Sequence, residues 1–362
     1  MAKLQIHIPA YNEEKNIGYV IRDILDQEYK DISLVIHDNK STDNTIVECI
    51  EAIGGDPRAK VNKAPLNIGA LYGGLRAKCH YDAEYVCYRS ANDRIHKNFI
   101  PECIDLLLSD LNVGLAYSHG YIFENNINNS TPCDDVFKID TRGMDPVLSS
   151  LQVVSRYTYS FPLWGIYRRS VLESLRPYQF VHGGDHILIA EAALYGSVAA
   201  TSSRLEYKDM STSDIDGQRT INNAKSQLEE YQRKINEESF LYGVKHLNPF
   251  TDMTYGHIEM YSLARIPEHN KLHLMNSSIS ILKKRFDTII NLEARNFIQY
   301  VINNVNKLET FPKFYDLRIL IWIQKVKTEL YKMKVLESLD FNIINSLETT
   351  LNTLALKFKN LS

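Results

Sequence analysis

The stretch EYVCYRSAND, residues 84–93, decides how the rest of the sequence is interpreted. Its first six residues are mostly apolar and predict a buried strand, and the polar residues that follow fall where this strand ends. In open α/β sheets, ligands bind in the crevice outside the carboxyl ends of the strands. A carboxylate at such a place can hold a hard divalent cation, and the cation can hold phosphates. We therefore expect Asp93 to be a metal ligand.

Strand and helix signals alternate on both sides of this stretch. The sequence predicts strands at 4–9, 32–36, 58–64, 84–89 and 113–118, and helices at 13–25 (with Asn12 as its N-cap), 46–53, 67–80 and 98–108. This alternation implies an α/β fold with a mostly parallel sheet and helices on both faces. Right-handed crossovers then bring the ends of three strands, with Pro9, Asp38 and Asp93, to one edge of the sheet.

The second half of the chain departs from this pattern. Residues 124–147 are expected to form a long loop of the kind that serves as a lid. A helix at 148–157, a strand at 164–168, a helix from Asp185 to Leu194 and short strands at 198–200 and 205–207 follow. From about residue 215 amphipathic helices dominate, the clearest at 275–290, 292–308, 315–336 and 343–358. We expect an α/β domain at 1–214 and an all-helical C-terminal domain at 215–362.

Composition bounds the class of protein. With 362 residues, 44% of them hydrophobic and 23% charged, the chain is typical of a globular protein of two domains. A net charge of −3 argues against a dedicated nucleic-acid binder. Residues 271–362 carry 14 Lys and Arg against 8 Asp and Glu, a net charge of +6. This basic segment either favours an anionic membrane surface or forms an ordinary solvated helical face.

A cytoplasmic location is expected, with peripheral association at a membrane surface as the alternative. The N-terminus runs straight into a strand, without a signal peptide. The apolar run from Ile319 to Ile323 is far shorter than the roughly 20 residues of a spanning helix. The five cysteines form no CxxC pair, which fits reduced, buried thiols.

Each polar strand end also has a simpler interpretation. Asp38 is suited to accept a hydrogen bond from a nucleotide base, but it also fits a turn residue. Asp185 follows two glycines that allow a tight turn near a ligand, but it also fits a helix N-cap. Asp93 could cap the following helix instead of binding a metal. The combination of three such residues in one fold favours a site.

The sequence resembles the glycosyltransferase family 2 enzymes at five points. These are IPAYNEEKNI (residues 8–17), DNKSTDNT (38–45), Asn67-Ile68-Gly69, Asn92-Asp93 and Gly184-Asp185-His186. The ordered match covers about residues 3–210 and does not extend into the C-terminal third. Each motif alone is weak, and their order along the chain makes the resemblance specific.

The resemblance implies a GT-A fold, which is Rossmann-like, and a nucleotide-diphosphate sugar donor, with a UDP-sugar favoured. It places Asp93 on Mn²⁺ or Mg²⁺ bridging the diphosphate and makes Asp185 the base that deprotonates the acceptor hydroxyl in an inverting transfer. The donor-binding residues that it implies are Pro9, Tyr11, Glu13, Asp38, Asn67, Asn92, Trp164, Gly165 and Gly184. Glycan, lipid-linked and protein acceptors stay open, and no nucleic-acid partner is expected.

The sequence also departs from the family pattern. The first acidic position of the metal motif is Ser90, the second is Asn92, and Gly184 replaces a common Glu. The segment 207–210 lacks the Arg and His often found there, and His182, His186 and His257 are candidates to supply a further ligand. These departures leave an alternative: a catalytically weak nucleotide-sugar-binding or scaffolding protein. The C-terminal helices are expected to bind the acceptor, form a homodimer or contact a membrane.

Overall fold

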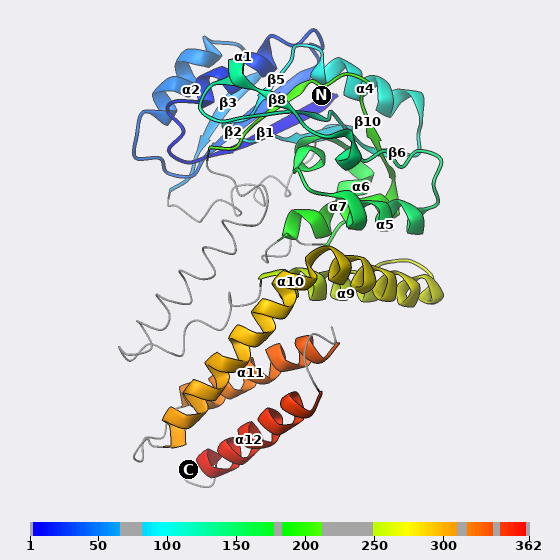
Figure 1. Cartoon of the computed structure of the whole chain (residues 1–362). Helices are drawn as coiled ribbons and strands as arrows, with labels where there is room; N and C mark the ends of the chain where they lie inside the picture. Colours follow the sequence, from blue (N-terminus) through cyan, green and yellow to red (C-terminus); the bar gives the residue numbers. More distant parts are fainter. Residues whose placement is uncertain are drawn as a thin grey trace. The chain divides into compact units, whose positions relative to one another are not determined.

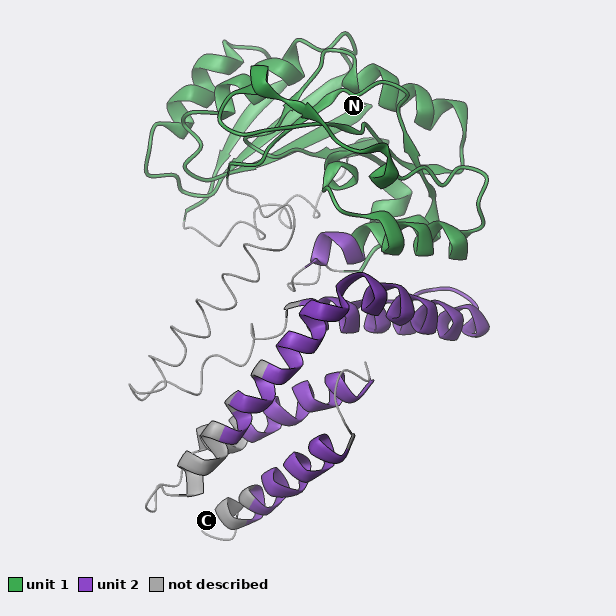
Figure 2. Cartoon of the chain, in the orientation of Figure 1, with its two compact units in different colours: residues 1–178, 188–215 green, residues 179–187, 216–362 purple. Residues whose placement is uncertain are grey.

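The structure is a computed structural model that describes residues 3–65, 82–176, 183–211, 249–309, 317–335 and 341–359. It divides into two compact units: Met1–Tyr178 with Leu188–Ile215, and Gln179–Ile187 with Asp216–Ser362 (Figure 2). Residues 179–187, which the sequence places in the first domain, group with the second unit. The helix expected at 67–80 lies outside the described residues.

Unit 1 contains a seven-stranded sheet in the order β10-β6-β9-β4-β1-β2-β3 (Figure 1). The strands are β1 (Leu4–Ala10), β2 (Ile32–Asp38), β3 (Ala59–Lys63), β4 (Tyr85–Tyr88), β6 (Val113–Tyr117), β9 (Ile166–Arg168) and β10 (Ser197–Ala200). Only β9 runs antiparallel to its neighbours β4 and β6; the other pairs in this sheet are parallel. The mostly parallel sheet that the sequence predicts is confirmed.

Alternation along β1 explains the core of this unit. Leu4, Ile6 and Ile8 are fully or almost fully buried on one face of the strand, where they belong to one apolar cluster with residues of the flanking helices. These helices are α1 (Ile17–Leu25), α2 (Thr45–Ile53) and α4 (Phe99–Ser109). Further helical segments of the unit are α5 (Pro146–Arg156), η4 (Phe161–Trp164), α6 (Arg169–Ser174) and most of α7 (Gly184–Tyr195). Burial of this apolar face drives the packing of helices on the sheet.

The first helix starts later than the sequence suggests. Asn12 does not cap it; α1 begins at Ile17, with Asn16 at the N-cap position. Asn12 has a φ of 54°, in the left-handed region that Asn tolerates better than most residues. Its Oδ1 accepts a hydrogen bond of 2.8 Å from the backbone N of Thr42. Asn12 therefore joins the loop after β1 to the loop after β2.

A second sheet of four strands, in the order β5-β11-β7-β8, was not expected from the sequence. It consists of β5 (Arg94–Ile95), β7 (Gly120–Phe123), β8 (Thr131–Pro132) and β11 (Glu206–Asp209). β8 and the short turns η2 (Ile127–Asn129) and η3 (Asp135–Phe137) lie in the segment 124–147, so the expectation of one long loop there was wrong. β8 pairs with β7 and anchors this segment to the sheet.

Unit 2 is helical in its described C-terminal part. Its helices are α9 (Pro249–Leu263), α10 (Glu268–Glu309), α11 (Leu317–Val335) and α12 (Phe341–Lys359). The two helices expected at 275–290 and 292–308 form one helix, α10, which is kinked at Phe286 (φ −125°, ψ 20°). Helix α9 packs against α10, and α11 packs against α12. The helical character predicted for the C-terminal region is confirmed.

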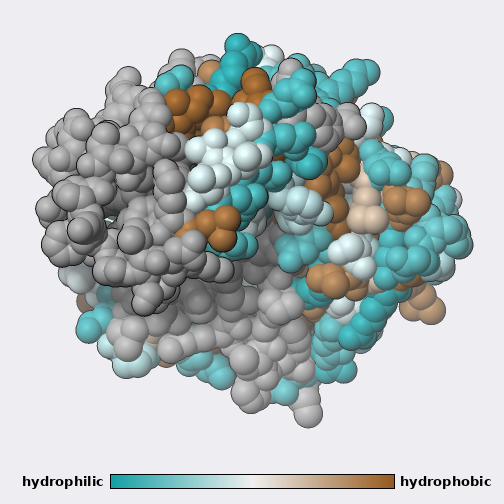
Figure 3. Space-filling model, turned by 90° about the horizontal axis from the view of Figure 1, so that it is seen from below, coloured by the Kyte–Doolittle hydropathy of each residue, from teal (hydrophilic) through white to brown (hydrophobic). Residues whose placement is uncertain are grey.

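The described helices are too short or too polar to cross a membrane. On the face drawn in Figure 3, hydrophobic groups lie in separate patches among hydrophilic ones.

Candidate functional site

The register of the sheet brings the polar strand ends of unit 1 together. In the parallel pair β1–β2, Ala10 lies opposite Asp38, and β4 pairs with the other side of β1. The chain leaves β4 toward the same edge and reaches Asp93 five residues later. Three strand ends thus meet at one edge, where α/β sheets bind ligands.

Asp38 and Tyr11 occupy this edge in different ways. Asp38 is only 1% exposed, and its two carboxylate oxygens accept the backbone N–H of Ser41 at 3.2 and 3.4 Å. The turn interpretation of Asp38 is therefore correct, although its carboxylate still has acceptor capacity for a second donor. Tyr11, one residue past β1, is 43% exposed and leaves a ring face accessible. Pro9 lies within β1, opposite His37.

Asp93 is deeply buried at this edge, with 2% exposure. Its Oδ1 accepts the backbone N–H of Asp209 at 2.9 Å. Its Oδ2 is buried and has no hydrogen-bond donor among the described residues, although the ammonium of Lys208 lies 3.6 Å away. Helix α4 begins at Phe99, after Asn98, so the alternative that Asp93 caps this helix is wrong. Asp93 instead presents one carboxylate oxygen that accepts no hydrogen bond from the described residues and has the Lys208 ammonium nearby.

Further acidic groups lie close to Asp93. Burial raises the pKa of Glu13, and the negative charges of Asp209, Asp43 and Asp93 raise it further, against a hydrogen bond from Asn16. Glu13 also donates its backbone N–H to Thr45 Oγ1 at 2.7 Å, which fixes the loop after β1 next to the start of α2. Excess negative charge at this edge favours a cationic ligand.

A buried ion pair lies behind Asp93. Nη1 of Arg89 lies 3.2 Å from Oε1 of Glu206, with side-chain exposures of 1% and 0%. Burial raises the pKa of Glu206 to about 7, because desolvation outweighs the attraction of Arg89 and is reinforced by Asp93. Arg89 Nη1 also donates to the carbonyl of Trp164 at 2.9 Å. This arginine connects the end of β4 with both η4 and β11.

Ser90 and Asn92, which precede Asp93, offer few ligands for a metal. The hydroxyl of Ser90 donates to the side-chain oxygen of Asn92, so these two side chains satisfy each other. The part of the chain that the structure describes contains no group of three or more His, Cys, Asp or Glu placed to hold a metal ion. The buried Oδ2 of Asp93, which accepts no hydrogen bond from the described residues, fits a divalent cation as a single ligand from the protein.

Trp164 is the last residue of η4, and Gly165 follows it. The indole Nε1 of Trp164 is buried and lacks an acceptor among the described residues. A Cβ at Gly165 would lie 2.6 Å from the carbonyl oxygen of Ala116, so this glycine is required for close packing against β6. Packing alone accounts for Gly165, whereas the free indole N–H leaves Trp164 available for a ligand.

Gly184 and Asp185 begin helix α7 and belong to unit 2. Asp185 is half-buried, and its Oδ1 accepts the N–H of His186 at 2.9 Å. The Nδ1 of His186 lies 2.7 Å from Nε2 of His257, so these two candidate metal ligands bond to each other. Asn67 and His182 lie outside the described residues.

Sequence analysis missed four residues that surround Asp93: Arg89, Glu206, Lys208 and Asp209. One signal was available, because three charged residues within the short strand at 206–209 are unusual for a buried position. The pairing of this strand with β5 and β7 in a separate sheet was not visible in the pattern.

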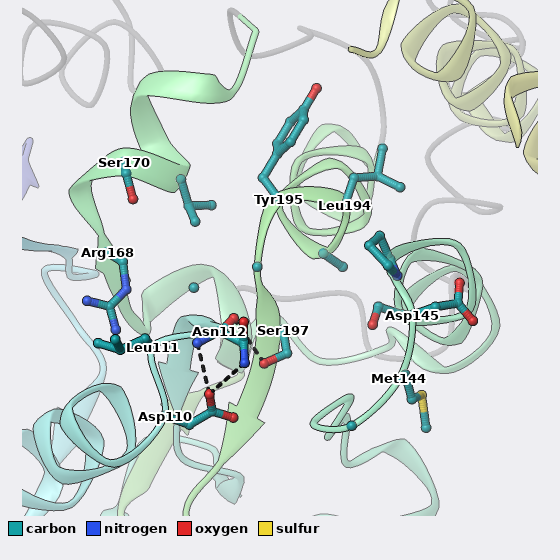
Figure 4. Close-up of a pocket in the computed structure, with 17 residues that line it drawn as sticks. Asp110, Leu111, Asn112, Met144, Asp145, Arg168, Ser170, Leu194, Tyr195 and Ser197 are labelled. Atoms are coloured by element: carbon teal, nitrogen blue, oxygen red, sulfur yellow. Dashed lines mark hydrogen bonds between the residues drawn. The ribbon is translucent and has the colours of Figure 1, made fainter. Parts of the chain in front are cut away.

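A cavity of about 530 Å³ lies elsewhere in unit 1 (Figure 4). It opens where β6 and β10 begin, and both strands run in the same direction as β1, so it lies at the opposite edge of the sheet from Asp38 and Asp93. Asp110, Asn112 and Ser197 line it and are hydrogen-bonded among themselves. The cavity is therefore separate from the candidate site.

Comparison with known proteins finds a family match within unit 1. Residues 5–172 match the model described as glycosyl transferase family 2. This range includes the strand ends with Tyr11, Asp38 and Asp93, and it stops before Asp185.

Solved structures with a similar fold cover almost the whole chain. A structure of S. aureus TarS residues 1–349 has 14% identity over 99% of this chain and 92% of that chain, with a TM-score of 0.58. A longer TarS structure has 14% identity over 96% of this chain and a TM-score of 0.59, and the match spans 55% of its length. TarS 1–349 in complex with UDP-GlcNAc gives 15% identity, coverages of 99% and 92%, and a TM-score of 0.55. At such identities the likeness shows a shared fold, the GT-A architecture with a helical C-terminal region.

Proposed function

We propose that this chain, whose residues 5–172 match the glycosyl transferase family 2 model, is a glycosyltransferase that moves a sugar from a nucleotide-diphosphate donor to an acceptor hydroxyl with inversion. The observation that carries this proposal is the buried Oδ2 of Asp93 at the carboxyl edge of the sheet, which accepts no hydrogen bond from the described residues. A UDP-sugar is the donor to test first, and the complex of TarS with UDP-GlcNAc supports this choice.

Residues at the strand ends bind different parts of the donor in this proposal. The exposed ring of Tyr11 packs on the nucleotide base, and the spare acceptor capacity of Asp38 receives a base N–H. Pro9, Glu13, Asn67, Asn92, Trp164, Gly165 and Gly184 complete the proposed donor-binding set. The indole N–H of Trp164 is the most specific of these, because it is buried without an acceptor in the described part of the chain and a sugar hydroxyl would satisfy it.

Asp93 would hold Mn²⁺ or Mg²⁺ in this proposal, together with the phosphates of the donor. The cation, when bound, neutralises the charge that develops on the departing diphosphate. The ammonium of Lys208, 3.6 Å from Asp93 Oδ2, adds a second positive charge at the same place. Asp185 accepts the proton of the acceptor hydroxyl. The hydroxyl oxygen bonds to the anomeric carbon as the bond to the diphosphate breaks on the opposite side, which inverts that carbon.

Binding without turnover is the second candidate, and one observation favours it. Lys208 already neutralises Asp93 in part, and Ser90 and Asn92 bond to each other, so the protein has a weaker cation site than one with two carboxylates. In that case the helices of unit 2 would serve assembly as their main role.

Assays of the purified protein with a panel of UDP-sugars and Mn²⁺ distinguish the two candidates. A donor that binds the native state raises its apparent thermal stability, and UDP release with and without an acceptor alcohol measures turnover. We expect Asp93→Asn and Asp185→Asn each to lower turnover by about 100-fold or more, the range seen when a positioned acid–base group is removed. Asp82→Asn is the matched control, because Asp82 is exposed and precedes β4 at its other end.

A thermal shift with no turnover in any condition would favour the binding-only candidate. Unchanged turnover in both variants would overturn the assignment of the site residues.

A further inference from the structure

We propose that His257 on α9 and Arg285 on α10 are positioning residues that set the orientation of Asp185 at the start of α7. This inference rests on the proposed function, since it takes Asp185 as the base. The residues involved, 183–187 and 249–309, all belong to unit 2. The segment 179–187 groups with the helices rather than with the sheet (Figure 2).

Helix α9 contacts the chain on both sides of Asp185. Gly183 has a φ of +67°, and a Cβ there would lie 2.4 Å from the sulfur of Met253. On the other side, Nδ1 of His186 lies 2.7 Å from Nε2 of His257. Met253 and His257 are four residues apart and therefore project from the same face of α9. One face of one helix thus fixes the backbone before Asp185 and the side chain after it.

The hydrogen bonds around His186 have a defined direction. Nη1 of Arg285 lies 3.4 Å from Nε2 of His186, and a guanidinium can only donate. His186 therefore accepts at Nε2, carries its proton on Nδ1 and donates it to Nε2 of His257. His257 is fully buried, and burial together with the charge of Arg285 lowers its pKa to about 3, so it stays neutral and able to accept. Because each side chain fixes the proton position of the next, the ring of His186 is held in one orientation.

His186 is connected to the base through its backbone. The backbone N–H of His186 donates to Asp185 Oδ1 at 2.9 Å, and the N–H of Ile187 donates to the carbonyl of Gly183 at 3.1 Å. Rotation of the first turn of α7 would break the His186–His257 bond or move Gly183 against Met253. The orientation of the Asp185 carboxylate is therefore coupled to α9.

Helix α10 carries Arg285 and also fixes the start of α9. The carboxylate of Glu293 accepts the backbone N–H groups of Phe250 and Thr251 at 2.9 and 3.0 Å, which caps the start of α9 from a different helix. The ring of Phe286, at the kink of α10, lies 4.9 Å from that of Phe250. Arg285 immediately precedes this kink, so the packing of the kink against α9 determines where the guanidinium points.

The test uses UDP release from a UDP-sugar in the presence of Mn²⁺, with the full chain and the donor found in the stability screen. In this reaction water attacks the anomeric carbon, its proton passes to Asp185, and UDP leaves. His257→Leu removes the acceptor for His186 at similar size, whereas His257→Gln keeps an oxygen that can accept. His273→Leu is the matched control, because His273 is exposed on α10.

We expect His257→Leu to lower kcat by about 10- to 100-fold with the KM for the donor changed less than about threefold, because misplacing a catalytic group by about an ångström costs that much in rate. His257→Gln should recover kcat to within about fivefold of the wild type, and His273→Leu should match the wild type. Arg285→Met, which removes the donor to His186, should lower kcat by about three- to tenfold with the same pattern in KM. A purely structural role would not give this split between kcat and KM or the rescue by Gln.

The outcomes separate this inference from the proposed function. If the wild type releases no UDP from any donor, or if Asp185→Asn retains full turnover, the proposed function fails. If Asp185→Asn is inactive while His257→Leu or Arg285→Met keeps the wild-type kcat, the inference alone fails. If His257→Leu does not fold, the inference is tested with Arg285→Met and His257→Gln instead. Equal losses in kcat in these two variants would overturn the inference.

Discussion

Replacement of Arg89 by Met should strongly destabilise unit 1. The Arg89 side chain is 1% exposed and makes three contacts that Met cannot replace: the ion pair with Glu206 at 3.2 Å, the hydrogen bond to the carbonyl of Trp164 at 2.9 Å, and a cation–π contact at 5.0 Å from the centre of the Phe99 ring. Met preserves most of the aliphatic packing. The variant therefore isolates the loss of charge.

The size of the destabilisation follows from the Glu206 charge that stays buried after Arg89 is replaced. Removing one partner of a buried ion pair costs about 3–5 kcal/mol, because the other charge stays buried without compensation. Glu206, with a pKa already near 7 beside Arg89, escapes part of this cost by taking up a proton. A carboxyl whose native pKa lies above its unfolded pKa favours the native state at low pH, and this contribution is lost as the pH rises through the native value. The loss of stability in Arg89→Met should therefore be smaller at pH 6 than at pH 8.

Urea unfolding followed by tryptophan fluorescence measures this effect in unit 1 alone. The chain has two tryptophans, and Trp322→Phe leaves Trp164, whose carbonyl accepts from Arg89, as the single reporter. In this background we expect Arg89→Met and Glu206→Leu each to cost about 3–5 kcal/mol, and the double variant to cost much less than their sum, since it removes both charges. Additive losses, or a loss below about 1 kcal/mol for Arg89→Met at pH 8, would contradict the buried pair as the stabilising element.

Three further predictions concern single residues. His7 is buried beside His37, and burial together with the charges of His37 and Lys60 lowers its pKa to about 3. The contribution of neutral His7 to stability is therefore present above pH 6.5 and is lost as the pH falls toward 3. In urea titrations His7→Phe should reduce the slope of the unfolding free energy against pH by up to about 1.4 kcal/mol per pH unit. Glu293→Gln should cost unit 2 about 1–3 kcal/mol in thermal or urea unfolding, because an amide NH₂ would face a backbone N–H of α9, and an unchanged midpoint would refute the cap. A Cβ at Gly120 would lie 2.0 Å from the carbonyl of Glu206, so Gly120→Ala should cost about 1–3 kcal/mol and weaken donor binding in a thermal-shift assay.

Much of unit 1 was predictable because its signals are local. The apolar residues of the strand at 4–10 are buried as the sequence pattern predicts, although polar His7 is buried as well, and the helical spacing of Ile17, Val20, Ile21 and Ile24 gives the buried stripe of α1. The start of α1 was predicted wrongly because Asn12 is of a residue type that is favoured at helix N-caps. Its side chain is instead used by a loop 30 residues away, a long-range contact that no local pattern contains.

The candidate site was predictable only where it sits on a strand end. Asp38 and Asp93 follow apolar runs and could be placed from periodicity, and the family resemblance gave them a role. Lys208 and Asp209 reach Asp93 through β11, more than 110 residues later, in a sheet whose strands are two to four residues long. Strands this short give too few alternating positions for a pattern, and their pairing depends on tertiary packing.

Asp93 connects the two sheets of unit 1, and this position explains why one carboxylate can carry so much of the site. β4 belongs to the large sheet and β5 to the small one, with Asp93 immediately before β5. Its Oδ1 is held by the N–H of Asp209 on β11, while Arg89 and Glu206 tie β4 to the same strand. A shift of the small sheet would therefore move Oδ2 relative to the ends of β1 and β2, where the nucleotide is proposed to bind. In a site with several carboxylates such a shift would be tolerated, because the remaining ligands would keep the cation in place. Here the buried ion pair and the close contact at Gly120 limit that shift, which is why substitutions at these two places are expected to change donor binding as well as stability.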